Sequence, residues 1–216
     1  MGVEILRCRV CQSSDLDILD LDERYYYCRN CEAIFIDREE IVDSEEEKER
    51  YEGHDNTHQN EGYVNMFEDF LEEVIFPFTE NISSVLEFGC GPGPVLADLL
   101  KKEGYEVDIY DPYFYPKKVF KKFNYDLITS TEVFEHFSEP RKEMDLLTDH
   151  LNKDGYLAVM TSFHPGPQEF EDWWYKWDPT HIVFYNLSTF KKLAEDFNLD
   201  IIYTDQEKYI LFQKNS

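Results

Sequence analysis

The stretch Val85-Leu86-Glu87-Phe88-Gly89-Cys90-Gly91-Pro92-Gly93 decides the fold of this chain. Its first four residues predict a buried strand, which breaks into a glycine-rich turn before a helix expected over residues 95–102. Alternate glycines let the backbone approach a ligand closely, and the start of the following helix offers free N–H groups. The stretch therefore predicts a nucleotide-cofactor loop after the first core strand.

Two carboxylates indicate which cofactor the loop suits. Glu87 precedes the first glycine by two residues, where it would repel a pyrophosphate but can accept a hydrogen bond from the amino group of a cationic sulfonium cofactor. Asp111 ends the next expected strand, about 20 residues after the glycines, where a carboxylate can hold both ribose hydroxyls. Both side chains favour S-adenosylmethionine over NAD.

Apolar segments and helical patterns alternate outward from this loop. Strands are expected over residues 85–88, 107–110, 127–130 and 156–161, helices over 95–102, 141–151 and 188–197, and two final strands near 201–204 and 209–213. This order predicts an α/β fold, a Rossmann-like and mostly parallel sheet with helices on both faces. The short turn between the last two strands predicts an antiparallel edge hairpin.

Residues 85–93, Asp111 and the strand-end stretch Thr129-Ser130-Thr131-Glu132-Val133-Phe134-Glu135-His136 resemble class I S-adenosylmethionine-dependent methyltransferases, over residues 81–216. The resemblance implies that the glycine turn lies under the methionine part, that the acid takes the ribose, and that the end of the fourth strand faces cofactor and substrate. Cofactor binding is thereby expected of Glu87, Gly89, Gly91, Gly93, Asp111 and Thr131, and Glu132 and Tyr63 are further candidates for it.

One departure from that family concerns the third strand. Only about fifteen residues separate Asp111 from the fourth strand, which is too few for the usual helix and a full third strand. The residues that would contact adenine are therefore not assigned.

Four cysteines form two pairs near the N-terminus: Cys8 with Cys11, and Cys28 with Cys31. Two such CxxC knuckles can place four thiolates at the corners of a tetrahedron, the geometry of closed structural Zn²⁺ sites. A redox dithiol or an iron–sulfur centre is the alternative, but a redox CxxC usually begins a helix after a strand, whereas these pairs flank a polar insert. We expect a zinc ribbon that folds a segment too short to bury its own core.

Three parts are predicted along the chain: a zinc ribbon over residues 1–40, an acidic linker with an amphipathic helix or lid over 41–80, and the methyltransferase domain over 81–216. The acidic run 43–49 is read as a solvated linker or helix face. Residues 64–74 carry apolar side chains at helical spacing until Pro77. The whole arrangement resembles bacterial proteins with a zinc ribbon before a methyltransferase domain, through residues 50–56, 62–63 and 178–185; this supports the class of chemistry and no particular substrate.

The formal net charge of −25 over 216 residues disfavours a nucleic-acid substrate, because it repels phosphate backbones. Lys117, Lys118, Lys121 and Lys122 form a local basic cluster, interpreted as a solvated face. No apolar run is long enough to span a membrane and no signal peptide is apparent, so a cytoplasmic protein is expected. The predicted partner is a small-molecule substrate.

Three histidines are candidates for a catalytic base: His54, His136 and His181. His181 follows a long insert after the fifth strand, His136 lies just beyond the fourth strand, and His54 falls in a predicted lid over residues 50–63. Each also has a structural interpretation: His181 bonded to Asp178, His136 as a satisfied residue at a helix start, and His54 as a solvated loop residue.

The insert before His181 is rich in aromatic residues: Trp173, Trp174, Tyr175 and Trp177. We favour a hydrophobic substrate pocket over a small satellite core. The sequence thus predicts methyl transfer from S-adenosylmethionine to a small molecule at O, N or C. The alternatives are a macromolecular acceptor recognised by the ribbon, and a non-catalytic cofactor-binding protein.

Overall fold

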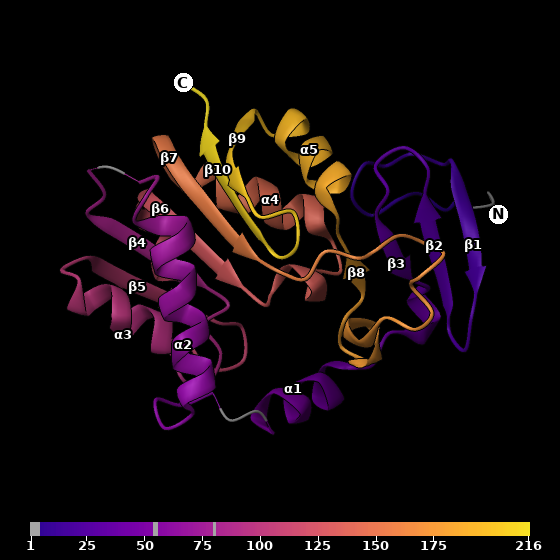
Figure 1. Cartoon of the computed structure of the whole chain (residues 1–216), viewed down its shortest axis with the longest axis horizontal. Helices are drawn as coiled ribbons and strands as arrows, with labels where there is room; N and C mark the ends of the chain where they lie inside the picture. Colours follow the sequence, from indigo (N-terminus) through magenta and orange to yellow (C-terminus); the bar gives the residue numbers. More distant parts are fainter. Residues whose placement is uncertain (1–4, 54–55, 80) are drawn as a thin grey trace.

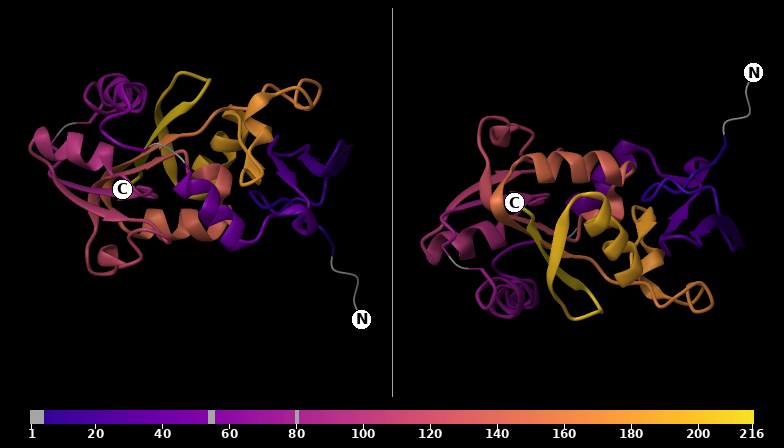
Figure 2. Two further views of the ribbon diagram at one scale, coloured as in Figure 1. Left: turned by 90° about the horizontal axis from the view of Figure 1, so that it is seen from below. Right: turned by 90° about the horizontal axis from the view of Figure 1, so that it is seen from above.

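A six-stranded and a four-stranded sheet lie one after the other along the long axis of the molecule (Figure 1). The computed structural model describes residues 5–53, 56–79 and 81–216. Figure 2 shows the small N-terminal sheet at one end and the larger sheet, with its helices, occupying the rest. None of the described helices is long and apolar enough to cross a bilayer.

The larger sheet has the order β5-β4-β6-β7-β10-β9. Its strands are β4 (Ser84–Phe88), β5 (Glu106–Tyr110), β6 (Tyr125–Thr131), β7 (Leu151–Met160), β9 (Leu199–Thr204) and β10 (Tyr209–Lys214). The first four in this order pair in parallel, and β10 pairs antiparallel with both β7 and β9. The predicted parallel sheet and edge hairpin are confirmed.

Helices cover both faces of this sheet. They are α2 (Glu61–Phe70), continued by a π-helical turn over Leu71–Ile75, then α3 (Val95–Lys102), α4 (Pro140–Asp149) and α5 (Leu187–Asp196). Successive strand residues point to opposite faces. Val85 and Leu127 therefore share one core with α2 and α3, whereas Leu86 and Ile128 share the other with α4 and α5.

The connection from β5 to β6 holds no third strand among the described residues. After β5 the chain makes an isolated bridge between Asp111 and Tyr115 and a short 3₁₀ turn over Val119–Lys122. Phe120 in this turn is buried against Phe88 and Tyr110. The connection is as short as expected, and β5 forms the sheet edge.

The smaller sheet contains β1 (Leu16–Asp20), β2 (Arg24–Cys28) and β3 (Ile34–Ile36), paired antiparallel. A fourth strand, β8 (Val183–Phe184), comes from the insert after β7 and pairs with β3. All four paired residues of β3 and β8 are buried, and this core continues into the face of the large sheet that α4 and α5 cover. Sequence patterns did not predict β8, which is only two residues long.

The acidic run forms most of α1 (Ser44–Glu52), after a 3₁₀ turn over Arg38–Glu40. The Asp43 side chain accepts hydrogen bonds from the N–H groups of Glu45 and Glu46, so it caps the helix. The helix has no buried residue and runs between the ribbon and α2 (Figure 1). The acidic run is therefore a helix face.

Candidate active site

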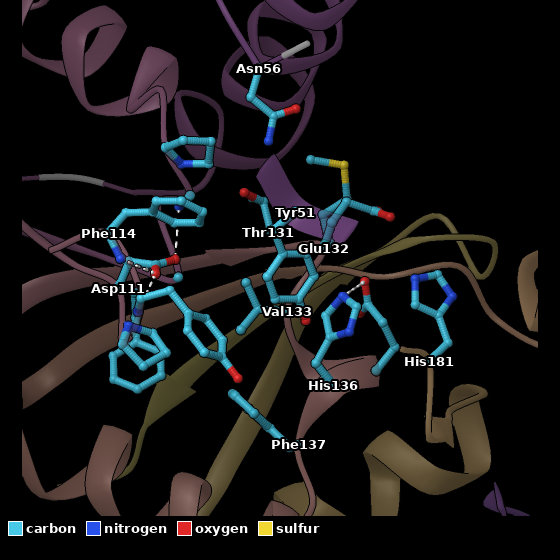
Figure 3. A pocket seen from close by; sticks show the side chains of 18 of the residues that line it. Tyr51, Asn56, Asp111, Phe114, Thr131, Glu132, Val133, His136, Phe137 and His181 are labelled. Atoms are coloured by element: carbon cyan, nitrogen blue, oxygen red, sulfur yellow. Dashed lines mark hydrogen bonds and ion pairs between the residues drawn. The ribbon is translucent and has the colours of Figure 1, made fainter. Parts of the chain in front are cut away.

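A cavity of about 680 Å³ lies at the carboxyl ends of the parallel strands. Gly89, Asp111 and Thr131 contribute to its wall from the ends of β4, β5 and β6, while Tyr51 of α1 and Tyr63 of α2 line it from the covering helices. Its volume is within the range of small-molecule sites, about 300–1,000 Å³. Figure 3 shows Asp111 at one side of this cavity and His136 and His181 at the other.

The glycine loop forms the first wall. Gly89 and Gly91 have positive φ angles of 85° and 63°, a backbone conformation that residues with a side chain rarely adopt. A Cβ on Gly89 would lie 2.3 Å from Cγ2 of Val133, and one on Gly93 would lie 1.8 Å from the carbonyl oxygen of Asn56. Gly89 and Gly91 line the cavity, whereas Gly93 packs against the segment that precedes α2.

Asp111 joins the glycine loop to the segment after β5. Its Oδ2 accepts a hydrogen bond from the Gly91 N–H at 3.0 Å, and its Oδ1 accepts from the N–H groups of Tyr113 and Phe114 at 2.8 and 3.0 Å. The carboxylate is buried yet lines the cavity. Since each carboxylate oxygen can accept two bonds, Oδ2 keeps one position for a ligand.

Glu87 lies outside the wall of the cavity. Its side chain is 2% exposed, Oε2 has no hydrogen-bond partner, and the Ala97 N–H in the first turn of α3 is the neighbour that most favours its ionised form. Burial raises the pKa of Glu87 to about 8. The carboxyl therefore sits beneath the loop and the start of α3, while Thr131, Glu132 and Tyr63 do line the cavity.

Two histidines meet at the far end of the cavity, with ring centroids 4.9 Å apart. Nδ1 of His136 is 2.9 Å from the Thr180 carbonyl oxygen, and Nδ1 of His181 is 2.7 Å from that of Tyr175. Burial lowers the pKa of both rings, that of His181 to about 3. Both are neutral at pH 7. His54 lies outside the described residues.

Asp178 has other partners than the His181 ring. Its Oδ2 accepts a hydrogen bond from Nε of Arg50 at 3.0 Å and lies 2.9 Å from Nη2 in the same ion pair, and its Oδ1 accepts from Thr180. The His181 ring bonds to the carbonyl of Tyr175 instead, because Asp178 is drawn toward the Arg50 guanidinium of α1.

Two glutamates, at positions 132 and 135, stand beside the histidines at the start of the 3₁₀ turn Phe134–His136. Glu135 is 0% exposed; its Oε2 accepts from the Thr161 hydroxyl at 2.7 Å, and burial raises its pKa to about 7. Glu132 accepts from the Tyr175 hydroxyl at 2.9 Å; the residue is exposed overall, but desolvation of its carboxyl in the cavity, together with the neighbouring Glu135, raises its pKa to about 8. Glu135 was not among the residues expected in the site, although the spacing Glu-x-x-Glu-His places it directly before His136.

Helix α1 is tied to the cavity through Glu47. Its carboxylate accepts hydrogen bonds from the hydroxyls of Tyr51 and Tyr113, each at 2.7 Å, and all three residues line the cavity. The Arg50–Asp178 ion pair fixes the same helix to the insert. The acidic run was given no chemical role from the sequence, but one of its members closes this wall.

The aromatic insert mostly forms a satellite core. Phe170 and Trp173 pack against Phe184 of β8, with ring centroids 4.9 and 5.8 Å away, and Tyr175 is buried beside Trp173. Trp174 is 61% exposed and lines the cavity. The pocket interpretation that we favoured from the sequence therefore holds for a single tryptophan of the insert.

The four cysteines form a second cluster, and none of them lines the cavity. Both pairs have the same geometry: the residue after each second cysteine, Gln12 or Glu32, has a φ of 63° and donates its N–H to the carbonyl of the first cysteine. Sγ of Cys8 is 3.6 Å from that of Cys31, and Sγ of Cys11 is 3.5 Å from that of Cys28. Four sulfurs bound tetrahedrally at 2.3 Å from zinc would be about 3.8 Å apart, so the cluster fits this ion.

Residues 32–204 match the sequence model of a family described as a methyltransferase domain. No curated protein matches the sequence. Among solved structures, magnesium protoporphyrin IX methyltransferase from Synechocystis PCC 6803 superposes with a TM-score of 0.53 at 13% identity, covering 81% of this chain and 89% of that one. The plantazolicin methyltransferase BpumL gives 0.53 at 14%, covering 80% and 93%. An O-methyltransferase family protein from Burkholderia thailandensis gives 0.50 at 13%, covering 73% of this chain and 59% of that one. These similarities show the fold.

Proposed function

Because this chain belongs to the class I S-adenosylmethionine-dependent methyltransferases, we propose that it methylates a small molecule held in the cavity beneath α1 and α2. The observation that carries the proposal is the cover over the cavity: Glu47 and Tyr51 of α1 and Tyr63 and Phe67 of α2 all line it. The ribbon strands β1 to β3 contribute no lining residue. A covered site of this volume suits a small acceptor better than a macromolecular surface.

The residues at the glycine loop fit the cofactor. Side chains at Gly89 and Gly91 are disfavoured by their positive φ angles, so the backbone stays open for a close ligand. Asp111 is placed to accept from ribose hydroxyls, and Thr131 and Tyr63 stand on neighbouring parts of the wall. We propose these residues, rather than Glu87, as the direct contacts. Bound S-adenosylmethionine supplies an electrophilic methyl group on a positively charged sulfur.

The opposite end of the cavity is where we place the acceptor. Methyl transfer is an in-line displacement, so these residues mainly align the acceptor and exclude water. Glu132 is the best-suited proton acceptor, because its pKa of about 8 is near neutrality, whereas that of His181 is about 3. His136 and His181 then act as neutral positioning groups for the acceptor.

Zinc in the ribbon has a structural role in this proposal. Cys8, Cys11, Cys28 and Cys31 would fill all four positions of the ion, leaving none for substrate. Strand β3 of the ribbon pairs with β8, which begins two residues after His181. The ribbon would thereby hold the histidine loop against the cavity.

Calorimetry with S-adenosylhomocysteine tests the cofactor end. Gly91→Ala should weaken binding at least about tenfold, because the residue lines the cavity. The matched control is Gly104→Ala: Gly104 also has a positive φ, 96°, but its Cβ would meet nothing within 4 Å. Equal losses in both variants would contradict the assigned cofactor wall.

Transfer of label from methyl-labelled S-adenosylmethionine tests the acceptor class. Cell extract is separated into metabolite, protein and RNA fractions, and each is incubated with the enzyme. We expect label in the metabolite fraction. Label confined to protein or RNA would overturn the small-molecule proposal in favour of a macromolecular acceptor.

A further inference from the structure

Three potential metal ligands converge at the acceptor end of the cavity. One atom from each of Glu135, His136 and His181 lies within 4.8 Å of the others, and all three residues line the cavity. Protein ligands lie about 2.0–2.2 Å from a divalent transition metal, so the three atoms need to close by less than about 1 Å to share one ion. Two imidazoles with one carboxylate form a common set for such ions.

The hydrogen bonds of the two rings determine which nitrogen of each ring can bind a metal ion. A carbonyl oxygen can only accept, so Nδ1 of His136 and of His181 must each carry the proton that they donate to Thr180 and Tyr175. In the neutral rings, each Nε2 then holds a lone pair. An N–H donated to a backbone carbonyl is the usual outer contact of a metal-bound histidine.

The third ligand is an unpartnered buried oxygen. Glu135 is completely buried, and its Oε2 is held by Thr161, but Oε1 has no hydrogen-bond donor. Oε1 lies 3.6 Å from Nε2 of His136, which is longer than a normal hydrogen bond. When the Glu135 carboxyl is ionised, three electron-pair donors thus face one another with no donor hydrogen between them, which is costly unless a proton or a metal cation occupies the space.

We propose that Glu135, His136 and His181 bind a divalent transition-metal ion, separate from the zinc of the ribbon. Three protein ligands leave coordination positions open, and all three residues line the cavity, which gives an acceptor access to them. An acceptor oxygen can occupy such a position.

If the proposed function holds, the site assigns the acceptor to compounds with a hydroxyl group, because a metal ion lowers the pKa of a bound hydroxyl. In the reaction the hydroxyl proton passes to the Glu132 carboxylate. The oxygen lone pair forms the new O–CH₃ bond, and the electron pair of the broken S–CH₃ bond stays on sulfur. The products are the methyl ether and S-adenosylhomocysteine.

Mn²⁺ is the probe that separates this site from the ribbon, because it competes poorly for thiolates. Protein with its ribbon metal in place is titrated with Mn²⁺, and the electron paramagnetic resonance signal of free Mn²⁺ is recorded. We expect about one Mn²⁺ bound per chain. Glu135→Gln and His181→Gln should each weaken binding more than about tenfold.

His150→Gln is the matched control, because Nδ1 of His150 also bonds to a backbone carbonyl, that of Leu146, but the residue does not line the cavity. It should bind Mn²⁺ like the wild type. Thr161→Val, which keeps the shape of the side chain and removes the hydroxyl that bonds to Glu135 and lies 3.4 Å from the Tyr175 hydroxyl, should weaken binding by about tenfold.

Two results would overturn the site. One is Mn²⁺ binding that the triad variants do not change. The other is the absence of both Mn²⁺ binding and a second equivalent of Zn²⁺ after equilibrium dialysis. S-adenosylhomocysteine calorimetry on the same samples keeps the two proposals apart: retained cofactor binding with no Mn²⁺ site would reject only the metal, and the reverse would reject only the cofactor wall.

Discussion

The cysteine cluster of the ribbon and the cluster of Glu135, His136 and His181 differ in what surrounds their ligand atoms. Three of the four cysteines are at most 1% exposed, and the two knuckles repeat one backbone geometry. The second cluster has three ligand groups and borders a cavity of about 680 Å³. If both clusters bind metal ions as proposed, one chain contains a closed site for folding and an open site for chemistry.

The two clusters are also connected through the backbone. Strand β3, which follows Cys31, pairs with β8, which follows His181, and the N–H of Ile182 donates to the carbonyl of Glu135 at 2.8 Å. The Cys31 carbonyl accepts from Thr189, and the Glu32 carbonyl lies 2.8 Å from Nε2 of His164. We infer that loss of the closed site disturbs the open one, whereas loss of the open site leaves the closed one intact.

The largest effect should come from breaking the closed site with Cys28→Ser. Since metal binding supplies folding free energy to such a small segment, we expect the unfolding midpoint to fall by at least about 10 °C, together with loss of the bound zinc. Methyl transfer should fall as the His181 loop loses its β3 support. Scanning calorimetry measures the unfolding midpoint and metal analysis measures the bound zinc. Ser13→Ala, in the same region, is the control. An unchanged midpoint would show that the ribbon folds without metal.

Removing the proposed base, Glu132, which lies beside the open site, should leave the fold unchanged. Glu132→Gln is expected to lower turnover by at least about 100-fold, with the unfolding midpoint within about 2 °C of the wild type. In the wild type, only ionised Glu132 can accept a proton, so turnover should rise with pH. Without an ion at Glu135 it should level off above the Glu132 pKa of about 8, and a bound divalent cation should move the rise to lower pH. A pH–rate profile measures this, and a flat wild-type profile between pH 6 and about 9 would count against Glu132.

The cofactor end should respond separately from both clusters. Asp111→Asn keeps the shape of the side chain but loses its charge, so S-adenosylhomocysteine should bind about 10- to 100-fold more weakly. Mn²⁺ binding should stay within about twofold of the wild type, because Asp111 is not among the three proposed ligands. Calorimetry measures the first quantity and magnetic resonance the second. Parallel loss of both would mean that the two ends of the cavity are not independent.

Glu87 was expected from the sequence to contact the cofactor, whereas in the structure it is buried beneath the glycine loop, and a substitution can distinguish the two. Its folded-state pKa, about 8, is above its usual value of 4.5, so folding favours the protonated form. The wild type should therefore lose stability as pH rises from about 5 to 8, by up to about 5 kcal/mol, and Glu87→Gln should remove this loss. Urea unfolding of both proteins at about pH 5 and pH 9 measures this difference in stability. A tenfold loss of S-adenosylhomocysteine affinity in this variant would instead restore Glu87 as a direct cofactor contact.

The smallest effect is expected at the ion pair that joins α1 to the insert. Arg50→Gln removes the bond to Asp178, but the guanidinium is half exposed, so the pair contributes little to stability. We expect KM for the acceptor to rise by about two- to fivefold with the unfolding midpoint unchanged. Lys48→Gln, which loses an exposed pair within α1, is the control. Equal KM values for the wild type and both variants would show that the Arg50–Asp178 pair does not position α1 for acceptor binding.

The sequence by itself determined the fold class and the succession of strands and helices along the chain around the glycine loop. Local rules were sufficient there, because a buried strand, a glycine turn and an amphipathic helix are each encoded within about ten residues. The cysteine spacing indicated the metal cluster for the same reason, and the short stretch after Asp111 correctly excluded a full third strand.

Only the tertiary structure decided the pairing of β3 with β8, the convergence of Glu135, His136 and His181, and the position of Glu87 beneath the loop. Each depends on residues that are distant in sequence, and Glu135 and His181 are brought together only when the insert folds back over the strand ends. The orientation of a ring nitrogen or a carboxylate depends on its hydrogen-bond partners, and those partners are set by packing rather than by local sequence pattern.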